Sequence, residues 1–313
     1  MPQMTPSQAR VVDPLVTAVA RGYESPESAV ANVLFPIVSV GQRAGTIIVF
    51  GKEQFDIVDT KRAPGASTKR SQFAYGSDKF SLIDYRMEAM VPFEIQEEAA
   101  AVPGINLIEM SIRKVQDQMA LERENEAAVL ARNAANYAAS NKVTLSGTDL
   151  WTNAASNPFV VVEAGKEAIR KKIGKRPNVL ELPPVVLSAL RIHPMVLNKI
   201  STSTDRTPAT IAQLQAMFEV DQIVEGTAIY NGATGFADVW GNDAILAYVS
   251  PKSMREMGSQ SFGYTYQLIG RPTVEEGYDD RNRNSWIVPY TDARAPYLTG
   301  ANGGFLIQNA VAP

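Results

Sequence analysis

The stretch WTNAASNPFVVVEAGKEAIRKKIGKRPNVLELPPVVLSALRIHPMVLNKI, residues 151–200, carries helix and strand signals in alternation. Residues 161–174 have apolar side chains at helical spacing and end at Gly174, a residue type that favours the left-handed conformation found after helices. Residues 177–183 predict a buried strand, and Pro184 is suited to the first turn of a short helix. This alternation predicts a mixed α/β domain in this half of the chain.

The composition fits a globular protein with a substantial core. The chain has 313 residues, of which 45% are apolar, and its formal net charge is −3. Proteins that mainly grip nucleic acid usually carry a basic excess, so this balance argues against that role for the chain as a whole. There is no cysteine, which excludes disulfides and thiolate metal sites. No apolar run approaches the ~20 residues that span a bilayer, and residues 1–14 lack the pattern of a secretory signal.

A long helix is predicted over about residues 104–140. Apolar residues recur at steps of three and four from Ile105 to Met119, and no proline or glycine interrupts the segment from 105 to 140. At 1.5 Å per residue such a helix is roughly 54 Å long. The polar residues ERENE at 122–126 indicate that one end or face of the helix leaves the core. A coiled-coil strand is disfavoured, because the apolar stripe breaks after two heptads.

A long β-hairpin is predicted before this helix. Residues 45–50 and 54–59 are strand-like, and residues 71–76 and 78–95 return with a similar composition. The segment TKRAPGASTKRS at 60–71 forms the tip. A hairpin of this length with few core-sized clusters is not stable alone in water, so we expect it to lie on another surface.

Residues suited to catalysis are scarce. His193 is the single histidine, and its neighbours predict a turn between two short helical segments, which favours a structural role over a Ser-His-Asp triad. The carboxylate doublets at 97–98, 275–276 and 279–280 are poor catalytic pairs, because adjacent residues on a strand point to opposite faces. The sequence therefore predicts no enzyme, no catalytic residue, no cofactor and no metal ion. A hydrolase that uses two carboxylates from distant segments stays open as an alternative.

The predicted elements together describe a flattened, extended subunit. It has an N-terminal arm, a long hairpin, a long helix and a separate α/β domain. Such a shape exposes much of its surface unless copies of the same chain cover it, which favours self-assembly.

The order of several motifs resembles the major capsid proteins of tailed bacteriophages. The segment VANVLFPIVSVGQRAGTIIVFGKEQF (30–55) is similar to the start of their extended loop, and RAPG (62–65) is similar to the loop itself. The stretch at 151–200 is the most specific part of the resemblance, with the turn SNP, the run GKRPN and the ending LRIHP. The dipeptide at 240–241 is similar to a later motif. The family often has Asp where Asn157 stands, so a role for that carboxylate is not carried over.

The resemblance implies an α+β phage major-capsid fold with an extended N-terminal arm, a long β-hairpin loop, a long spine helix, a peripheral domain and an α/β axial domain. It implies the following division of the chain: an N-terminal arm and short helix at 1–34, the extended β-hairpin loop at 35–95, the peripheral domain at 96–149 and 271–313 with the spine helix (about 104–140), and the axial domain at 150–270.

The function implied by the resemblance is that of a structural major capsid protein, which self-assembles into the icosahedral shell that encloses phage DNA. Its expected partners are itself as pentamers and hexamers, a portal, possible decoration proteins, and DNA bound without sequence specificity, but no membrane. We also expect a separate scaffolding protein, because the segment before the first predicted helix is short. The expected location is the virion capsid, assembled in the cytoplasm of the host bacterium. An encapsulin-like compartment shell and the carboxylate-dependent hydrolase are the alternatives.

The cations of the loop at 60–71 are predicted to meet acidic surface on an adjacent subunit, since charges at the rim of an interface steer assembly and fix its register. The predicted subunit-interface residues are Lys61, Arg62, Lys69 and Arg70, with Glu97 and Glu98 as candidate partners. A solvated loop and contact with packaged DNA are the alternatives.

A covalent cross-link is a further alternative for the same loop. Some relatives of this fold join a loop lysine to an asparagine of a neighbouring subunit. The candidates here are Lys61 or Lys69 with Asn282 or Asn284, but no motif identifies them.

Overall fold

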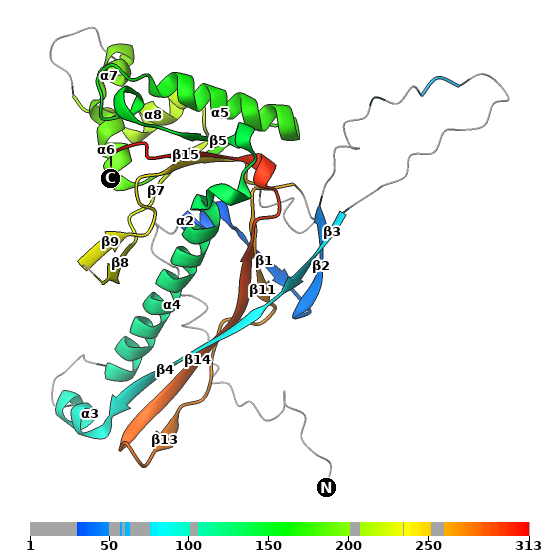
Figure 1. Cartoon of the computed structure of the whole chain (residues 1–313). Helices are drawn as coiled ribbons and strands as arrows, with labels where there is room; N and C mark the ends of the chain where they lie inside the picture. The colour runs from blue at the N-terminus through cyan, green and yellow to red at the C-terminus, as the bar shows by residue number, and fades with distance from the viewer. Residues whose placement is uncertain are drawn as a thin grey trace.

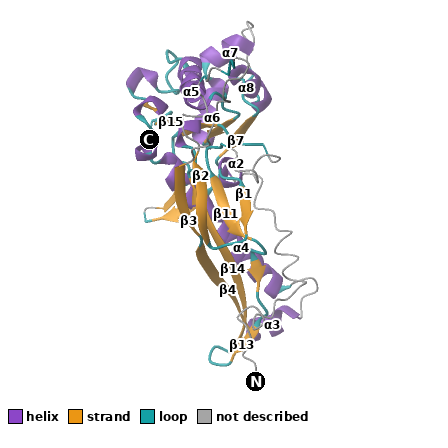
Figure 2. Cartoon of the chain, turned by 90° about the vertical axis from the view of Figure 1, so that its right-hand side faces the viewer, coloured by secondary structure: helices purple, strands orange, loops and turns teal. Residues whose placement is uncertain are grey.

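The computed structural model describes residues 30–49, 57, 60–62, 76–100, 106–200, 207–233, 235–251 and 260–312. These residues form an elongated molecule (Figures 1 and 2). One end is rich in helices that surround a small sheet. The other end is a long, narrow sheet with a single long helix running beside it.

In the described part of the chain, the narrow sheet has six strands, and one of them holds the others together. The strands are β1 Ile37–Val40, β4 Ile83–Pro92, β11 Tyr264–Leu268, β12 Thr273–Val274, β13 Tyr278–Asp280 and β14 Ser285–Tyr297. On one edge β14 pairs antiparallel with β4 over ten residues, and on the other edge it pairs in turn with β13, β12 and β11. Strand β1 lies parallel to β11. Because both edges of β14 are paired, it is the central strand.

The base of the predicted hairpin is present. Strand β2 (Ala44–Val49) pairs antiparallel with β3 (Gly76–Ser81), and the tip at 60–71 is described only at residues 60–62. The strand predicted at 78–95 is wrong as a single element. It divides at Leu82 into β3 and β4, and it ends at Pro92, where helix α3 (Phe93–Ala100) begins.

The long helix, α4, spans Leu107–Arg132 and is shorter than predicted. Asn106 caps its first turn by accepting a hydrogen bond from the Glu109 amide. Side chains after Arg132 replace the next helical turn: the Asn136 amide donates to the Leu130 carbonyl (2.9 Å), and the Tyr137 hydroxyl donates to the Ala131 carbonyl (2.6 Å). These bonds satisfy the carbonyls that a helix end leaves open, so the backbone can turn there.

Helix α4 packs against two apolar clusters in turn. The cluster at its N-terminal half contains Ile112, Val115, Met119, Ala89, Val274, Val288 and Tyr290. The cluster at its C-terminal half includes Ala127, Ala128, Ala131, Leu34, Trp240 and Ile245. The helix therefore spans from the narrow sheet to the helix-rich end.

The polar residues at 122–126 lie between these clusters. One face of this segment is in solvent, as expected, and the other lies in a buried polar layer that the sequence did not predict. Glu124 is buried, and its carboxylate accepts hydrogen bonds from the Ala31 amide (3.0 Å) and the Trp240 indole (2.8 Å). Glu126 lies 3.6 Å from the guanidinium of Arg294 on β14. Helix α4 therefore stays in contact with the sheet through its polar segment.

The helix-rich end is built on a second sheet, which has five strands in the described residues, in the order β5-β15-β10-β6-β7. Their bounds are β5 Lys142–Thr144, β6 Val179–Leu182, β7 Gln222–Glu225, β10 Ala244–Ala247 and β15 Gly304–Gln308. Strands β5 and β15 join this sheet although the resemblance assigned their residues to the peripheral domain, and β11 joins the narrow sheet although it was assigned to the axial domain.

Helices cover both faces of the five-stranded sheet. One apolar cluster joins the sheet to the helices α5 Pro158–Ile173, α6 Pro184–Ile192, α7 Pro194–Ile200 and α8 Ile211–Phe218. The opposite face is covered by α2 (Val30–Leu34) and the end of α4. Helix α5 starts three residues earlier than the predicted 161–174, and Gly174 caps it in the left-handed conformation as predicted. The remaining short elements are β8 Ile229–Gly232, β9 Gly235–Asp238, and the 3₁₀ turns η2 Ala134–Asn136, η3 Ala139–Asn141, η4 Gly147–Asp149 and η5 Ala301–Gly303.

We expect Gly165→Ala to destabilise the protein by about 1 kcal/mol. A Cβ at Gly165 would lie 2.9 Å from the Cδ1 atoms of both Leu246 and Phe305. Overpacking of a core typically costs ~1–3 kcal/mol, which outweighs the ~1 kcal/mol that alanine gains over glycine in a helix. Urea unfolding measures the difference. The control is Gly41→Ala, where a Cβ would meet nothing within 4 Å. A Gly165→Ala protein as stable as wild type would contradict this packing.

Candidate assembly surface

The predicted interface residues that the structure describes belong to two separate segments, one before β3 and one after β4. Lys61 and Arg62 are exposed, in the loop that returns through β3 to the start of β4. Glu97 and Glu98 are exposed on α3, which follows the end of β4. Ten residues of strand span roughly 33 Å. A contact between these two groups in neighbouring copies of the chain stays a prediction. Lys69 and Arg70 lie outside the described residues.

Helix α3 is anchored to the turn before β14. Asn284 donates a side-chain hydrogen bond to Glu94 (2.7 Å), and its carbonyl accepts from the Phe93 amide (3.0 Å). The hydrogen bond from Asn284 lowers the pKa of the Glu94 carboxyl. In the same turn Asn282 donates its backbone amide to Asp280 (3.0 Å). The side chain of Asn284 therefore has a structural task, and its role in a cross-link stays a prediction.

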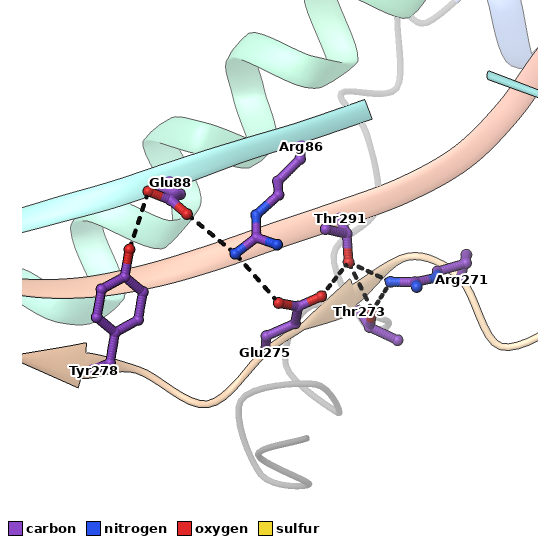
Figure 3. A network of polar contacts seen from close by, with 7 residues as sticks. All are labelled: Arg86, Glu88, Arg271, Thr273, Glu275, Tyr278 and Thr291. Carbon is purple, nitrogen blue, oxygen red and sulfur yellow. Dashed lines mark hydrogen bonds and ion pairs between the residues drawn. The ribbon is translucent and has the colours of Figure 1, made fainter. Parts of the chain in front are cut away.

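A polar network covers the face of the narrow sheet that points away from α4 (Figure 3). Arg86 of β4 lies 3.1 Å from Glu88 and 3.5 Å from Glu275, which precedes β13. The Tyr278 hydroxyl donates to Glu88 across the strands (3.4 Å). These contacts join β4 to the segment that carries β12 and β13, on the far side of β14.

The second half of the network is centred on Thr291 of β14 (Figure 3). The Thr291 hydroxyl is 3.4 Å from Glu275 and 3.1 Å from the Thr273 hydroxyl. The Arg271 guanidinium donates to both threonines. Sequence reasoning missed this network, because its members come from four strands and the segments between them, whose register no local motif reveals.

A ribbon of two strands exposes apolar side chains on both of its faces. Among the described strands, β8 and β9 pair only with each other. Phe236 is 79% exposed, Ile229 is 51% exposed and Tyr230 is 42% exposed. In the register of the ribbon, Phe236 lies opposite Asn231. An isolated two-stranded ribbon is at best marginally stable in water, and exposed apolar groups of this size are typical of surfaces that another molecule covers.

His193 has the structural role predicted for it. It is buried, its Nε2 lies 3.1 Å from the Asn153 carbonyl and 3.1 Å from the Ser156 hydroxyl, and its Nδ1 accepts the Met195 amide (3.2 Å). A catalytic triad needs a carboxylate on the second ring nitrogen. A backbone amide occupies that position here, so Ser156 and His193 do not form a triad.

Two other kinds of site are absent from the part of the chain that the structure describes. No cluster of three or more His, Cys, Asp or Glu side chains is arranged to hold a metal ion. Within the same residues, no helix has the length and apolar character needed to cross a bilayer.

Comparison with known proteins identifies the relatives of this chain. The major capsid protein of Burkholderia phage BcepMu is 36% identical over 306 residues, which cover 96% of this chain and 97% of that protein. This chain belongs to the phage major capsid protein family. No family model matches the sequence.

Solved structures agree with this assignment. A phage-related protein of Bordetella bronchiseptica RB50 is 43% identical, with a TM-score of 0.81 over 98% of this chain and 99% of that chain. An encapsulin of Synechococcus elongatus PCC 7942 has a TM-score of 0.54 at 11% identity, over 93% of this chain and 94% of that chain. The encapsulin shares the fold alone. The predicted α+β phage major-capsid fold is confirmed, and the chain is a structural shell protein of a phage capsid.

For a capsid protein, the surfaces described above are where contacts between copies are expected. Relatives of this family assemble into capsid shells, so this chain is a self-assembling subunit of a virion. The loop base, α3 and the β8–β9 ribbon project from different places on the elongated molecule (Figures 1 and 2). Different surfaces that meet one another build rings and shells from a single kind of chain.

We expect Arg86→Gln to lower the free energy of unfolding by less than about 1 kcal/mol. The Arg86 side chain is half exposed, so water screens its ion pairs, and the backbone pairing of β4 with β14 is unchanged. Urea unfolding at low and high salt measures the loss, which should shrink as salt rises. Glu109→Gln, which removes the exposed i,i+4 pair with Arg113 on α4, is the matched control. A loss of several kcal/mol for Arg86→Gln alone would show that the network holds the strands in register.

Proposed function

We propose that this chain assembles as pentamers and hexamers into an icosahedral shell that encloses phage DNA, and that assembly takes place in the host cytoplasm. The observation that carries the proposal is the relation to a phage major capsid protein at 36% identity over 96% of the chain. The elongated shape and the exposed surfaces at several places support it, because one isolated copy leaves them uncovered. Electron microscopy of the purified protein tests it: closed particles support it, and a soluble monomer at high concentration contradicts it.

We propose that the chain is divided into the structural regions that the resemblance implies. Residues 1–34 act as an arm, 35–95 as an extended loop, and 96–149 with 271–313 as a peripheral domain. Residues 150–270 act as an axial domain. The presence of two separate sheets supports two structural units. The pairing of β15 with β10 and of β11 with β14 ties the units together.

The shell functions without catalysis in this proposal. Support comes from the relatives, which are structural proteins by name, and from the backbone contacts that occupy both nitrogens of His193. A separate scaffolding protein, a portal and a decoration protein are proposed partners. These three follow from family membership, as does a DNA cargo that is bound without sequence specificity.

The basic loop and the acidic helix α3 are proposed to meet between neighbouring copies. Lys61 and Arg62, together with Lys69 and Arg70, supply the positive partner, while Glu97 and Glu98 supply the negative one. The two groups lie in separate segments of the chain, one before β3 and one after β4, which supports a head-to-tail contact between copies. Opposite charges at the rim of such a contact mainly guide the approach and register of the copies.

Reversing the loop charges tests this contact. We expect Lys61→Glu with Arg62→Glu to reduce the yield of shells, because like charges placed together cost several kcal/mol while an exposed pair contributes only ~0.2–1 kcal/mol. Adding Glu97→Lys and Glu98→Lys to the same chain should restore part of the yield. Light scattering and electron microscopy at two salt concentrations measure it.

The matched control reverses Lys171 and Lys172, two exposed cations of α5 outside the proposed contact. If the loop variant assembles with the same yield and salt response as wild type, the contact is wrong.

The apolar ribbon provides a second test of assembly. We expect Phe236→Ser to weaken assembly about tenfold or more while leaving the stability of the subunit within about 0.5 kcal/mol, since the side chain is exposed in the free chain. Asn231→Ser, on the same face of the ribbon, is the control. Critical concentration for particle formation and thermal unfolding of the unassembled subunit are the two measurements. If the critical concentration of Phe236→Ser equals that of the wild type and of Asn231→Ser, the ribbon is not part of the interface.

A further inference from the structure

The carboxyl group of Glu181 is fully enclosed in the part of the protein that the structure describes. It lies in strand β6, in the interior of the five-stranded sheet, and is 0% exposed. Among the described residues neither of its carboxyl oxygens has a hydrogen-bond partner. A buried polar group without a partner costs free energy, and an ionised one costs far more.

Gly226 leaves space for the carboxyl group of Glu181. A Cβ at Gly226 would lie 2.9 Å from Oε1 of Glu181 and 2.6 Å from the Trp240 ring. Any larger residue at this position would push the carboxyl or the indole aside. The end of strand β7 is thus shaped around the Glu181 side chain.

The charged groups near Glu181 come from each element packed on that face of the sheet. Helix α4 contributes Glu124 and Arg132, and the segment before β10 contributes Asp243. Tyr137, after η2, also faces Glu181, and its hydroxyl is already bound to the Ala131 carbonyl. The charged neighbours of Glu181 are therefore two carboxylates, Glu124 and Asp243, and one guanidinium, Arg132.

The guanidinium of Arg132, the positive group near Glu181, already has two other partners. Arg132 donates to Asp243 (2.9 Å) and to the Val239 carbonyl (3.0 Å). Glu124 is held by the Trp240 indole and the Ala31 amide. A charged carboxylate at Glu181 would add negative charge beside Glu124 and Asp243 that the single guanidinium does not balance, which favours the neutral form of Glu181. Burial raises the pKa of Glu181 well above its usual range, Arg132 opposes the shift, and the nearby carboxylates of Asp243 and Glu124 add to it.

This group of residues joins the two ends of the molecule. Helix α4 runs from the narrow sheet to this point, and Arg132, its last residue, contacts the segment before β10. Strand β6 lies beside β10 in the five-stranded sheet. A change of charge at Glu181 therefore falls where α4 meets the five-stranded sheet.

We propose that Glu181 is a proton-operated switch: the neutral carboxyl allows helix α4 to rest on the five-stranded sheet, and loss of its proton loosens that contact. The sign follows from the direction of the shift. The stabilising contribution is fully present below the pKa of an unfolded glutamate, ~4.3, and is lost as pH rises through the raised value of the folded state. Each unit of elevation changes the folding equilibrium about tenfold.

The variant Glu181→Gln tests the switch, since glutamine has the same shape and stays neutral. Unfolding is followed from about pH 5 to about pH 9 for wild type and variant. We expect the wild type to lose stability relative to Glu181→Gln as pH rises, by at least tenfold in the unfolding equilibrium over this range. The control is Glu225→Gln on the neighbouring strand β7, which should keep the pH dependence of wild type. Parallel curves for wild type and Glu181→Gln would overturn the proposal.

Two further measurements report on the mechanism. Infrared spectra of the wild type at neutral pH should show the carbonyl band of a protonated carboxylic acid that disappears in Glu181→Gln. Hydrogen exchange in residues 121–132, compared at equal pH, should be faster in the wild type than in the variant only at the alkaline end. The wild-type infrared spectrum decides the question even if Glu181→Gln does not fold, because an absent band means an ionised Glu181 and no switch.

Discussion

The pairing of β14 with β4 is the interaction on which the rest of the molecule depends. It joins ten residues near the start of the described chain to ten near its end, and it leaves the other edge of β14 for β13, β12 and β11. Three features are positioned by this ladder. The base of the loop continues into one end of β4, helix α3 follows the other end, and α4 packs along one face. A slip of one residue would turn the apolar face of β4 away from α4.

Helix α4 connects the narrow sheet to the five-stranded sheet. It packs on one apolar cluster at each end, and a polar layer lies between the two clusters. Apolar contacts alone would fix the depth of packing but would tolerate rotation, whereas directed hydrogen bonds specify orientation. Glu124 receives one bond from α2 and one from the segment before β10. Because Glu124 and its two partners come from three separate parts of the chain, the layer specifies how the two ends of the molecule are joined, and the carboxyl of Glu181 lies beside it.

The sequence predicts elements well where local chemistry defines them. Gly174 ends α5 as predicted, and the run without proline or glycine does contain the long helix. The sequence predicts the structure poorly where contacts between distant residues determine it. The end of α4 depends on Asn136 and Tyr137, whose side chains replace a helical turn that their propensity would allow. The polar network around Arg86 and Glu275 needs the register of four strands. The candidate interface residues came from charge and from the family resemblance, and the structure adds only where four of them lie.

The exposed surfaces differ in chemistry, and in the proposed shell this difference would give them different tasks. Apolar side chains such as Phe236 contribute affinity when covered, because their burial removes area from water. In the proposed contact, the charges on the loop and on α3 would remain hydrated at the rim, where exposed pairs contribute little affinity but select orientation. A shell needs weak individual contacts, so that misplaced copies can leave, and many of them, so that the closed particle persists. A ribbon with a few exposed apolar groups and separate charged ends meets both requirements, whereas one large apolar patch would aggregate before it could be ordered.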